Sequence, residues 1–225
     1  MSKVVRQPIF RNLLIILAIL DMVLLGVRLW PWPAALGLGG DSTTALDPLF
    51  TLCLYVVLAM WIGSTRGEQE RKSLFQAATL GAGAGALLVA LVWVASQPVV
   101  DGGTQHHKIQ ALLIAGALAI WGTAAIRSRR SGHSHGLAVI CATWSAMVSS
   151  LVGCTALLVE TYYSMTPDQS ADPWKQYQQG LAIGPESMQA LVHTLNAAAG
   201  FLLVGPVVGC IAGAALGAAI KPRKA

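Results

Sequence analysis

Six long apolar runs divide the chain, and short polar segments separate them. A helix needs about 20 apolar residues to cross the hydrocarbon core of a bilayer, and each run reaches or approaches that length. The pattern therefore predicts an all-α integral membrane protein, a bundle of six transmembrane helices that form a single domain over residues 1–225. We place the spans at about Ile9 to Trp30, Leu46 to Ile62, Ala77 to Ser96, Ile109 to Ile126, Leu137 to Tyr163 and Ser187 to Ile220.

Basic residues alternate between dense and sparse polar segments. Of the 15 basic residues, all but Arg28, Lys108 and Lys175 fall before or at the start of the first run, after the second, after the fourth or after the last. Cytoplasmic loops carry the excess of Lys and Arg. The distribution predicts a multi-pass protein of the cell (inner) membrane with both termini cytoplasmic. No small-residue cleavage site follows the first run, so we interpret it as an uncleaved span.

The composition excludes an ordinary soluble domain, because 55% of the residues are hydrophobic and only 11% are charged. Although the formal net charge is +5, the basic residues form short groups rather than one patch, so we expect no nucleic-acid partner. The four cysteines lie inside apolar runs without a CxxC pair. We interpret them as buried apolar side chains and expect neither a metal nor a cofactor.

The last run contains Gly205, Gly209, Gly213 and Gly217 at strict intervals of four, which we call the glycine stripe. This interval places all four on one face of a helix. Helices in lipid gain little from hydrophobic association, so close contact depends on small residues that let two backbones approach. The stripe therefore predicts a docking face for another helix.

A second pair of glycines, Gly81 and Gly85, gives the third run a GxxxG motif. This run is the simplest partner for the glycine stripe within the chain. The alternative partner is the last helix of a second copy of the chain.

Pro206 interrupts the middle of the last run. Proline lacks the backbone N–H that a helix needs, so we expect a kink beside Gly205. The kink fits either a hinge or a simple packing adjustment.

Three ionisable side chains lie inside the apolar runs, namely Asp21, Glu160 and His193, and Asn196 follows His193 by one helical turn. Such residues are costly in lipid and are candidates for function by default. With Arg28, they predict a polar pocket in the outer half of the membrane, where Glu160 and His193 exchange protons. In the alternative interpretation, Glu160, Arg28 and His193 reach the headgroup region, and only Asp21 lies too deep to do so.

The other histidines fit no metal site. His133 and His135 form an HxH and His106 adjoins His107, but neither pair has a third ligand, so we interpret them as solvated loop residues. A bis-histidine haem would need His107 to face His193, which we disfavour. Because no phosphate loop, GxSxG or HExxH motif is present, we expect no enzyme.

The longest outer segment, Ser164 to Glu186, contains Asp172 and Pro173 followed by Trp174. These residues favour a short amphipathic helix on the membrane surface, and a plain loop remains the alternative.

Two functions follow from these features. The first is a bundle that acts through close helix packing, as a homo-oligomer or as a small subunit of a larger membrane complex, with lipid and other subunits as partners. The second is a small transporter or channel that uses Asp21 as its buried acid and the Pro206 kink as its moving part.

Overall fold

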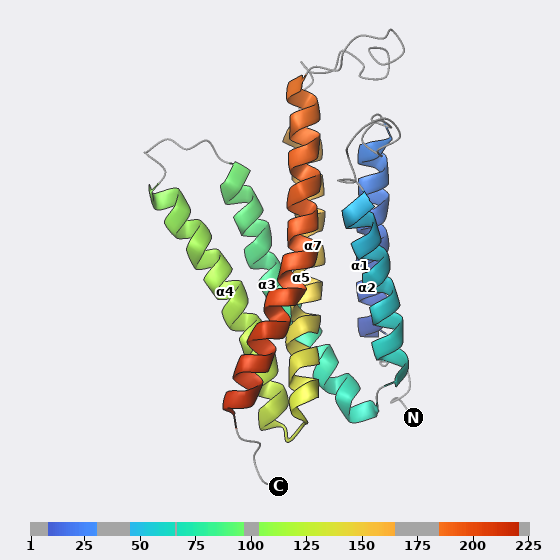
Figure 1. Ribbon diagram of the computed structural model, residues 1–225, viewed down its shortest axis with the longest axis vertical. Helices are drawn as coiled ribbons and strands as arrows, with labels where there is room; N and C mark the ends of the chain where they lie inside the picture. The colour runs from blue at the N-terminus through green and yellow to red at the C-terminus, as the bar shows by residue number, and fades with distance from the viewer. Residues whose placement is uncertain (1–8, 31–45, 66, 97–103, 165–184, 221–225) are drawn as a thin grey trace.

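A computed structural model of the chain describes residues 9–30, 46–65, 67–96, 104–164 and 185–220, and within these residues all regular structure is helical. The helices are α1 (Ile9–Leu29), α2 (Leu46–Thr65), α3 (Glu68–Ser96), α4 (Thr104–Arg130), α5 (His135–Ser164) and α7 (Pro185–Ala219). They run alternately up and down, so α1 begins and α7 ends at the same end of the bundle, which we call the lower end (Figure 1). The surface helix expected from Asp172 onward lies outside the described residues.

Four of the described helices are long and apolar enough to cross a membrane. The qualifying segments are Glu68–Ala95, His107–Arg130, His135–Glu160 and Thr194–Ala219, and α2 contributes a shorter apolar segment, Leu46–Ile62. The predicted all-α class is confirmed.

Two helices extend beyond their apolar runs into polar sequence. α3 begins at Glu68 instead of about Ala77, and α4 continues to Arg130 instead of about Ile126. Acidic side chains in the first turn of α3 and basic side chains in the last turn of α4 each oppose the partial charge of their helix end. Favourable charges at these two ends therefore extend both helices beyond their apolar runs.

A tight turn joins α4 to α5 at the lower end. Gly132 has a φ of 81°, and its N–H donates to Arg129 O at 3.1 Å while the following N–H donates to Ser128 O at 3.4 Å. This pair of bonds is a Schellman cap, which glycine favours because it adopts positive φ without strain. Ser134 then caps α5 by accepting the Leu137 N–H at 3.3 Å. The turn fixes α4 and α5 as antiparallel neighbours.

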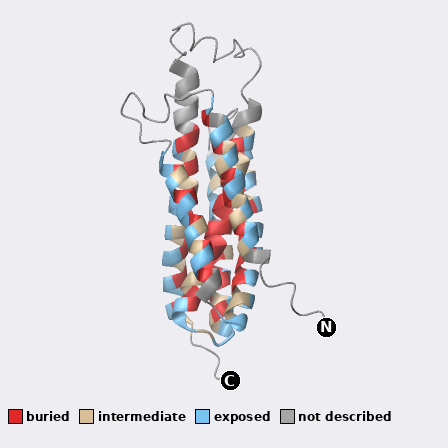
Figure 2. Ribbon diagram, turned by 90° about the vertical axis from the view of Figure 1, so that its right-hand side faces the viewer, coloured by how far each residue is buried: buried red, intermediate tan, exposed pale blue. Residues whose placement is uncertain are grey.

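The central helix is α5, which packs against α1, α3, α4 and α7. Trp144, Met147 and Leu151 are fully buried in it, and buried residues cluster in the middle of the bundle (Figure 2). One of its buried hydroxyls bonds to a neighbouring helix, since Ser149 Oγ accepts the Trp121 indole N–H of α4 at 2.9 Å.

All four residues of the glycine stripe face α5. A second stripe of small residues on α5 has the same interval of four, and the two match in antiparallel register. Opposed across the interface are Gly205 and Ser150, Gly209 and Ala146, Gly213 and Ala142, and Gly217 and Ala138. A Cβ on Gly209 would lie 2.6 Å from Ala146 Cβ, far inside normal contact distance. The absence of a side chain therefore sets the spacing of these two helices.

The prediction that the third run is the partner of the glycine stripe was wrong. α3 packs on another side of α5, where a Cβ on Gly81 would lie 2.5 Å from Ser145 O and one on Gly85 would lie 2.7 Å from Val152 Cβ. The small residues of α3 and α7 thus dock on the same helix rather than on each other. The reason is that α5 itself offers small side chains on its α7 side.

We expect Gly81→Ala and Gly209→Ala to destabilise the fold by about 1–3 kcal/mol each, because the added methyl must displace packed atoms. Gly83 and Gly200 are matched controls in the same helices, since a Cβ there meets nothing within 4 Å. Their change to alanine should be neutral or stabilising by up to about 1 kcal/mol, through helix propensity. The melting temperatures of all four variants are measured by thermal unfolding in detergent, followed by size exclusion. Equal melting temperatures for Gly81→Ala and Gly83→Ala would contradict the assigned contact.

Candidate functional site

Asp21 lies in the middle of α1 and is fully buried. Its Oδ1 accepts the Thr155 hydroxyl of α5 at 2.5 Å, and the Cys154 thiol adjoins the same carboxyl. Thr155 also approaches the carbonyl of Leu151 in its own helix at 2.9 Å, so its single proton is shared. Within the described residues, Asp21 Oδ2 has no hydrogen-bond partner. A buried carboxyl oxygen without a donor is costly and is available to a proton or a ligand.

Tyr55 of α2 forms a second polar link, to a backbone carbonyl at the centre of the bundle. The side chain is 3% exposed, and its hydroxyl donates to Leu202 O of α7 at 2.5 Å. In an unbroken helix that carbonyl would accept the N–H of residue 206, but Pro206 has none. Tyr55 therefore satisfies the backbone acceptor that Pro206 leaves open.

Pro206 lies within an uninterrupted helix, and the lower half of α7 leans away from the direction of its upper half (Figure 1). The opposing position on α5 is Ser150, which faces both the Tyr55 hydroxyl and Gly205. The absence of a side chain at Gly205 leaves room for the Ser150 hydroxyl, because a Cβ at residue 205 would overlap it.

Together these groups form what we call the central polar cluster, which unites side chains of α1, α2 and α5 with a backbone carbonyl of α7. Its members are Asp21, Tyr55, Ser150, Cys154, Thr155 and the carbonyl of Leu202. All of them lie within the bundle, away from its two ends.

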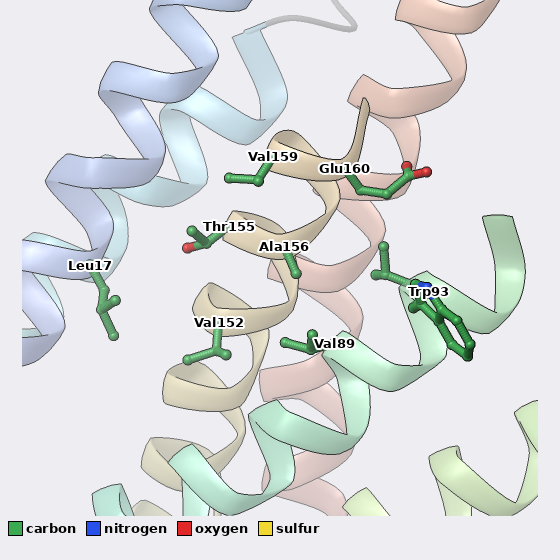
Figure 3. A pocket seen from close by; sticks show the side chains of 9 residues that line it. Leu17, Val89, Trp93, Val152, Thr155, Ala156, Val159 and Glu160 are labelled. Carbon is green, nitrogen blue, oxygen red and sulfur yellow. The ribbon is translucent and has the colours of Figure 1, made fainter. Parts of the chain in front are cut away.

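An open groove adjoins the cluster. It has a volume of about 440 Å³ and lies between α1, α3 and α5 (Figure 3). Thr155 lines the groove and donates to Asp21, so it connects the groove with the buried carboxyl. Glu160 and Trp93 also line the groove, and their side chains point in different directions (Figure 3).

The structure separates the candidates that the sequence had grouped. Asn196 is exposed, Glu160 lines the groove, and in the described part of the chain no hydrogen bond or ion pair joins either of them to Asp21. The side chains of Arg28 and His193 lie outside the described residues. Of the members of the predicted pocket whose side chains the structure describes, Asp21 belongs to the central polar cluster, whereas Glu160 and Asn196 do not.

Sequence reasoning missed Tyr55 and Thr155. One signal for Tyr55 was available, since a proline in mid-helix predicts an open carbonyl four residues earlier and hence a need for a donor. Thr155 gave no such signal, because a threonine in a transmembrane helix ordinarily bonds to its own backbone.

His133 is a loop residue, as predicted, but its side chain is less solvated than expected. It is half-buried, and its Nε2 lies 2.9 Å from Ser73 Oγ of α3. Beside it, Arg129 donates to His133 O at 3.0 Å, to Gly217 O at 3.0 Å and to Ile220 O at 3.3 Å. A guanidinium at these carbonyls satisfies the last turn of α7 and opposes its negative end. The turn after α4 thus holds the lower ends of α3 and α7.

No group of three or more metal-ligating side chains occurs within the described residues. His107 is exposed on the first turns of α4, with Nδ1 at 3.4 Å from Gln110 Oε1. The side chain of His106 is outside the described set.

Comparison with protein-family models, curated proteins and solved structures found no match to the chain. The class of protein therefore rests on its own architecture, an all-helical bundle with four helices long and apolar enough to cross a membrane. A carboxyl group buried at the centre of that bundle is its distinguishing chemical feature.

We expect Tyr55→Phe to destabilise the fold by about 1–3 kcal/mol, because the Leu202 carbonyl then has no donor. Pro206→Ala restores the helical N–H for that carbonyl, so the cost of Tyr55→Phe should fall by at least half in the Pro206→Ala background. A double-mutant cycle on unfolding in detergent measures the coupling. An equal cost in both backgrounds would show that the Tyr55 hydroxyl does not serve the acceptor left by Pro206.

Proposed function

We propose that the chain is a multi-pass protein of the cell (inner) membrane with six spans and cytoplasmic termini. The positions of the chain ends support this topology, because α1 begins and α7 ends at the lower end (Figure 1). The first turns of α3 and the last turn of α4 are at the same end, and they contain Arg71, Lys72, Arg127, Arg129 and Arg130. An excess of basic residues favours the cytoplasmic side.

Within that topology, we propose that the protein is a small transporter or channel coupled to protons rather than an enzyme. One observation carries the proposal, namely the fully buried carboxyl of Asp21 with an oxygen that has no donor among the described residues. Ionisable groups inside a membrane are costly and mark ion or proton pathways. Asp21 takes and releases the proton, and Thr155 connects it to the groove.

The moving part in this proposal is the contact of α2 with α7 beside Pro206. The open Leu202 carbonyl is held by Tyr55 of α2, whereas a carbonyl in a regular helix is held by its own helix. Movement of the Tyr55 side chain would therefore break the link between α2 and α7. The hydrogen bonds within each helix would stay intact. Such a link suits an element with two positions.

Asp21→Asn should abolish proton flux driven by a membrane potential in reconstituted vesicles, because the amide neither binds nor releases a proton. Asp47→Asn is the matched control, since Asp47 is exposed in the first turn of α2. Flux is measured with a pH-sensitive dye inside the vesicles. Unchanged flux in Asp21→Asn, or an equal loss in Asp47→Asn, would refute the role of Asp21.

Assembly as a homo-oligomer or as a small subunit of a larger complex is the second proposal. The glycine stripe no longer favours it, because α5 occupies the whole stripe. The outward face of α7 supports it instead, where Cys210, Ala214 and Ala218 are exposed at intervals of four beside Ile211, which is 63% exposed. Small residues at this interval permit close helix contact.

Under this proposal, Ala214→Leu should reduce the mass of the protein in mild detergent to that of one chain, since leucine keeps the outward face of α7 apolar but prevents close approach. Val207→Leu, on the same exposed face, is the control and should keep the assembled mass. Light scattering coupled to size exclusion gives the mass. A single-chain mass for the wild type, or no change in Ala214→Leu, would argue against assembly through this face.

A further inference from the structure

The two polar contacts of the Thr155 hydroxyl call for two protons, and the hydroxyl has one. Its Oγ1 lies 2.5 Å from Asp21 Oδ1 and 2.9 Å from Leu151 O. An ionised carboxylate and a backbone carbonyl are both acceptors with no proton to donate. If Asp21 is ionised, one of the two contacts therefore brings two oxygens together without a proton of its own. If Asp21 is protonated on Oδ1, it donates to Thr155 Oγ1 and Thr155 donates to Leu151 O, so that both contacts are hydrogen bonds.

The surroundings of Asp21 also favour its neutral form. The side chain is fully buried, and among the described residues Oδ2 has no donor. The titratable groups that face it from the packed helices are the Cys154 thiol of α5 and the Tyr55 hydroxyl of α2, both ordinarily uncharged at neutral pH. The charged side chains of α3 are in its first two turns, at the lower end of the bundle. A carboxylate buried without a cation is costly, and such a group takes up a proton instead.

We propose that the described arrangement is the proton-loaded form of the protein, in which Asp21 is neutral and its proton bonds to Thr155. Thr155 is the positioning residue, because its hydroxyl accepts from the acid and can turn to donate to the carboxylate after the proton has left. Oδ2 then still lacks a donor, so α1 separates from α5 until water reaches the carboxylate. This inference rests on the proposed transport function, since it identifies which step of the proton cycle the described arrangement represents.

Infrared absorption measures the protonation of Asp21 directly, because the C=O stretch of a neutral carboxyl is separate from the bands of a carboxylate. The full chain is measured at neutral pH in a maltoside detergent, which has no carbonyl of its own. We expect a neutral-carboxyl band in the wild type that is lost in Asp21→Asn and kept in Asp47→Asn, whose carboxyl is exposed. Isotope-labelled aspartate identifies the band in the wild type should Asp21→Asn not fold. Absence of the band would overturn the proposal.

The position of the same band tests Thr155. A neutral carboxyl that loses a hydrogen bond absorbs at higher wavenumber, so Thr155→Val should raise the wavenumber of the Asp21 band. Thr155→Ser keeps the hydroxyl and should leave the band in place. A merely structural role for Thr155 predicts no such difference, and an unshifted band in Thr155→Val would refute the bond from Asp21.

Cys154 reports the separation of α1 from α5, since it is 1% exposed and adjoins the carboxyl. Its labelling by a water-soluble maleimide is followed by peptide mass spectrometry and compared with that of Cys53, which is exposed on α2. Each unit of pH raises the ionised fraction of a carboxyl by up to about tenfold, and labelling of Cys154 in the wild type should approach that increase. In Asp21→Asn the side chain stays neutral, so Cys154 should stay protected. An equal rise with pH in both proteins would refute the separation.

The infrared and flux measurements fail separately. A neutral-carboxyl band from Asp21, in a protein whose proton flux is unaffected by Asp21→Asn, would refute the transport role and keep the protonation assignment. Proton flux that requires Asp21, in a protein without that band, would keep the transport role and refute the assignment of the described arrangement to the proton-loaded form.

Discussion

The close contact between α5 and α7 is the constraint on which the rest of the structure depends. Two stripes of small residues meet in register, with Gly209 opposite Ala146 at its centre. Such packing brings the backbones together without a contribution from larger side chains. Beside this contact, Pro206 leaves the Leu202 carbonyl of α7 without its helical donor, and a side chain of α2 bonds to that carbonyl. The packing of α5 and α7 and the polar chemistry at the centre are therefore parts of one arrangement.

The helices were largely predictable from the sequence, because apolar runs of sufficient length have few alternatives. The ends of the helices were not predictable. α3 begins nine residues before the expected start, in a segment rich in Glu, Arg and Lys whose low hydropathy is typical of a connector. The glycine stripe was correctly interpreted as a docking face, but the helix that docks there was not identified. Small residues indicate which face of a helix packs closely, and they do not indicate which helix packs against it. The matching interval from Ala138 to Ser150 was present in the sequence and indicates that partner.

Among the side chains of the central polar cluster, the sequence pattern singled out Asp21. Its depth in an apolar run required a partner, and the partner is Thr155, a neutral residue that nothing in the sequence distinguished. Charged residues attract attention in an apolar sequence, whereas hydroxyl groups are common there and bond to their own helix. Proximity between Asp21 and Thr155, 134 positions apart, is a property of the folded bundle alone.

The helices differ in the contacts that hold them to α5 and α7, and this difference indicates which helices can move. α3 and α7 pack on α5 through glycines, so sliding either would force atoms into contact. By contrast, the described hydrogen bonds that join α1 and α2 to the central pair are those of Asp21 with Thr155 and of Tyr55 with Leu202 O. A change at Asp21 alters the first link directly, because gain or loss of a proton changes what that carboxyl accepts. We therefore expect α1 and α2 to move together against a fixed core of α3, α5 and α7, which would open or close the groove along the boundary between α1 and α3.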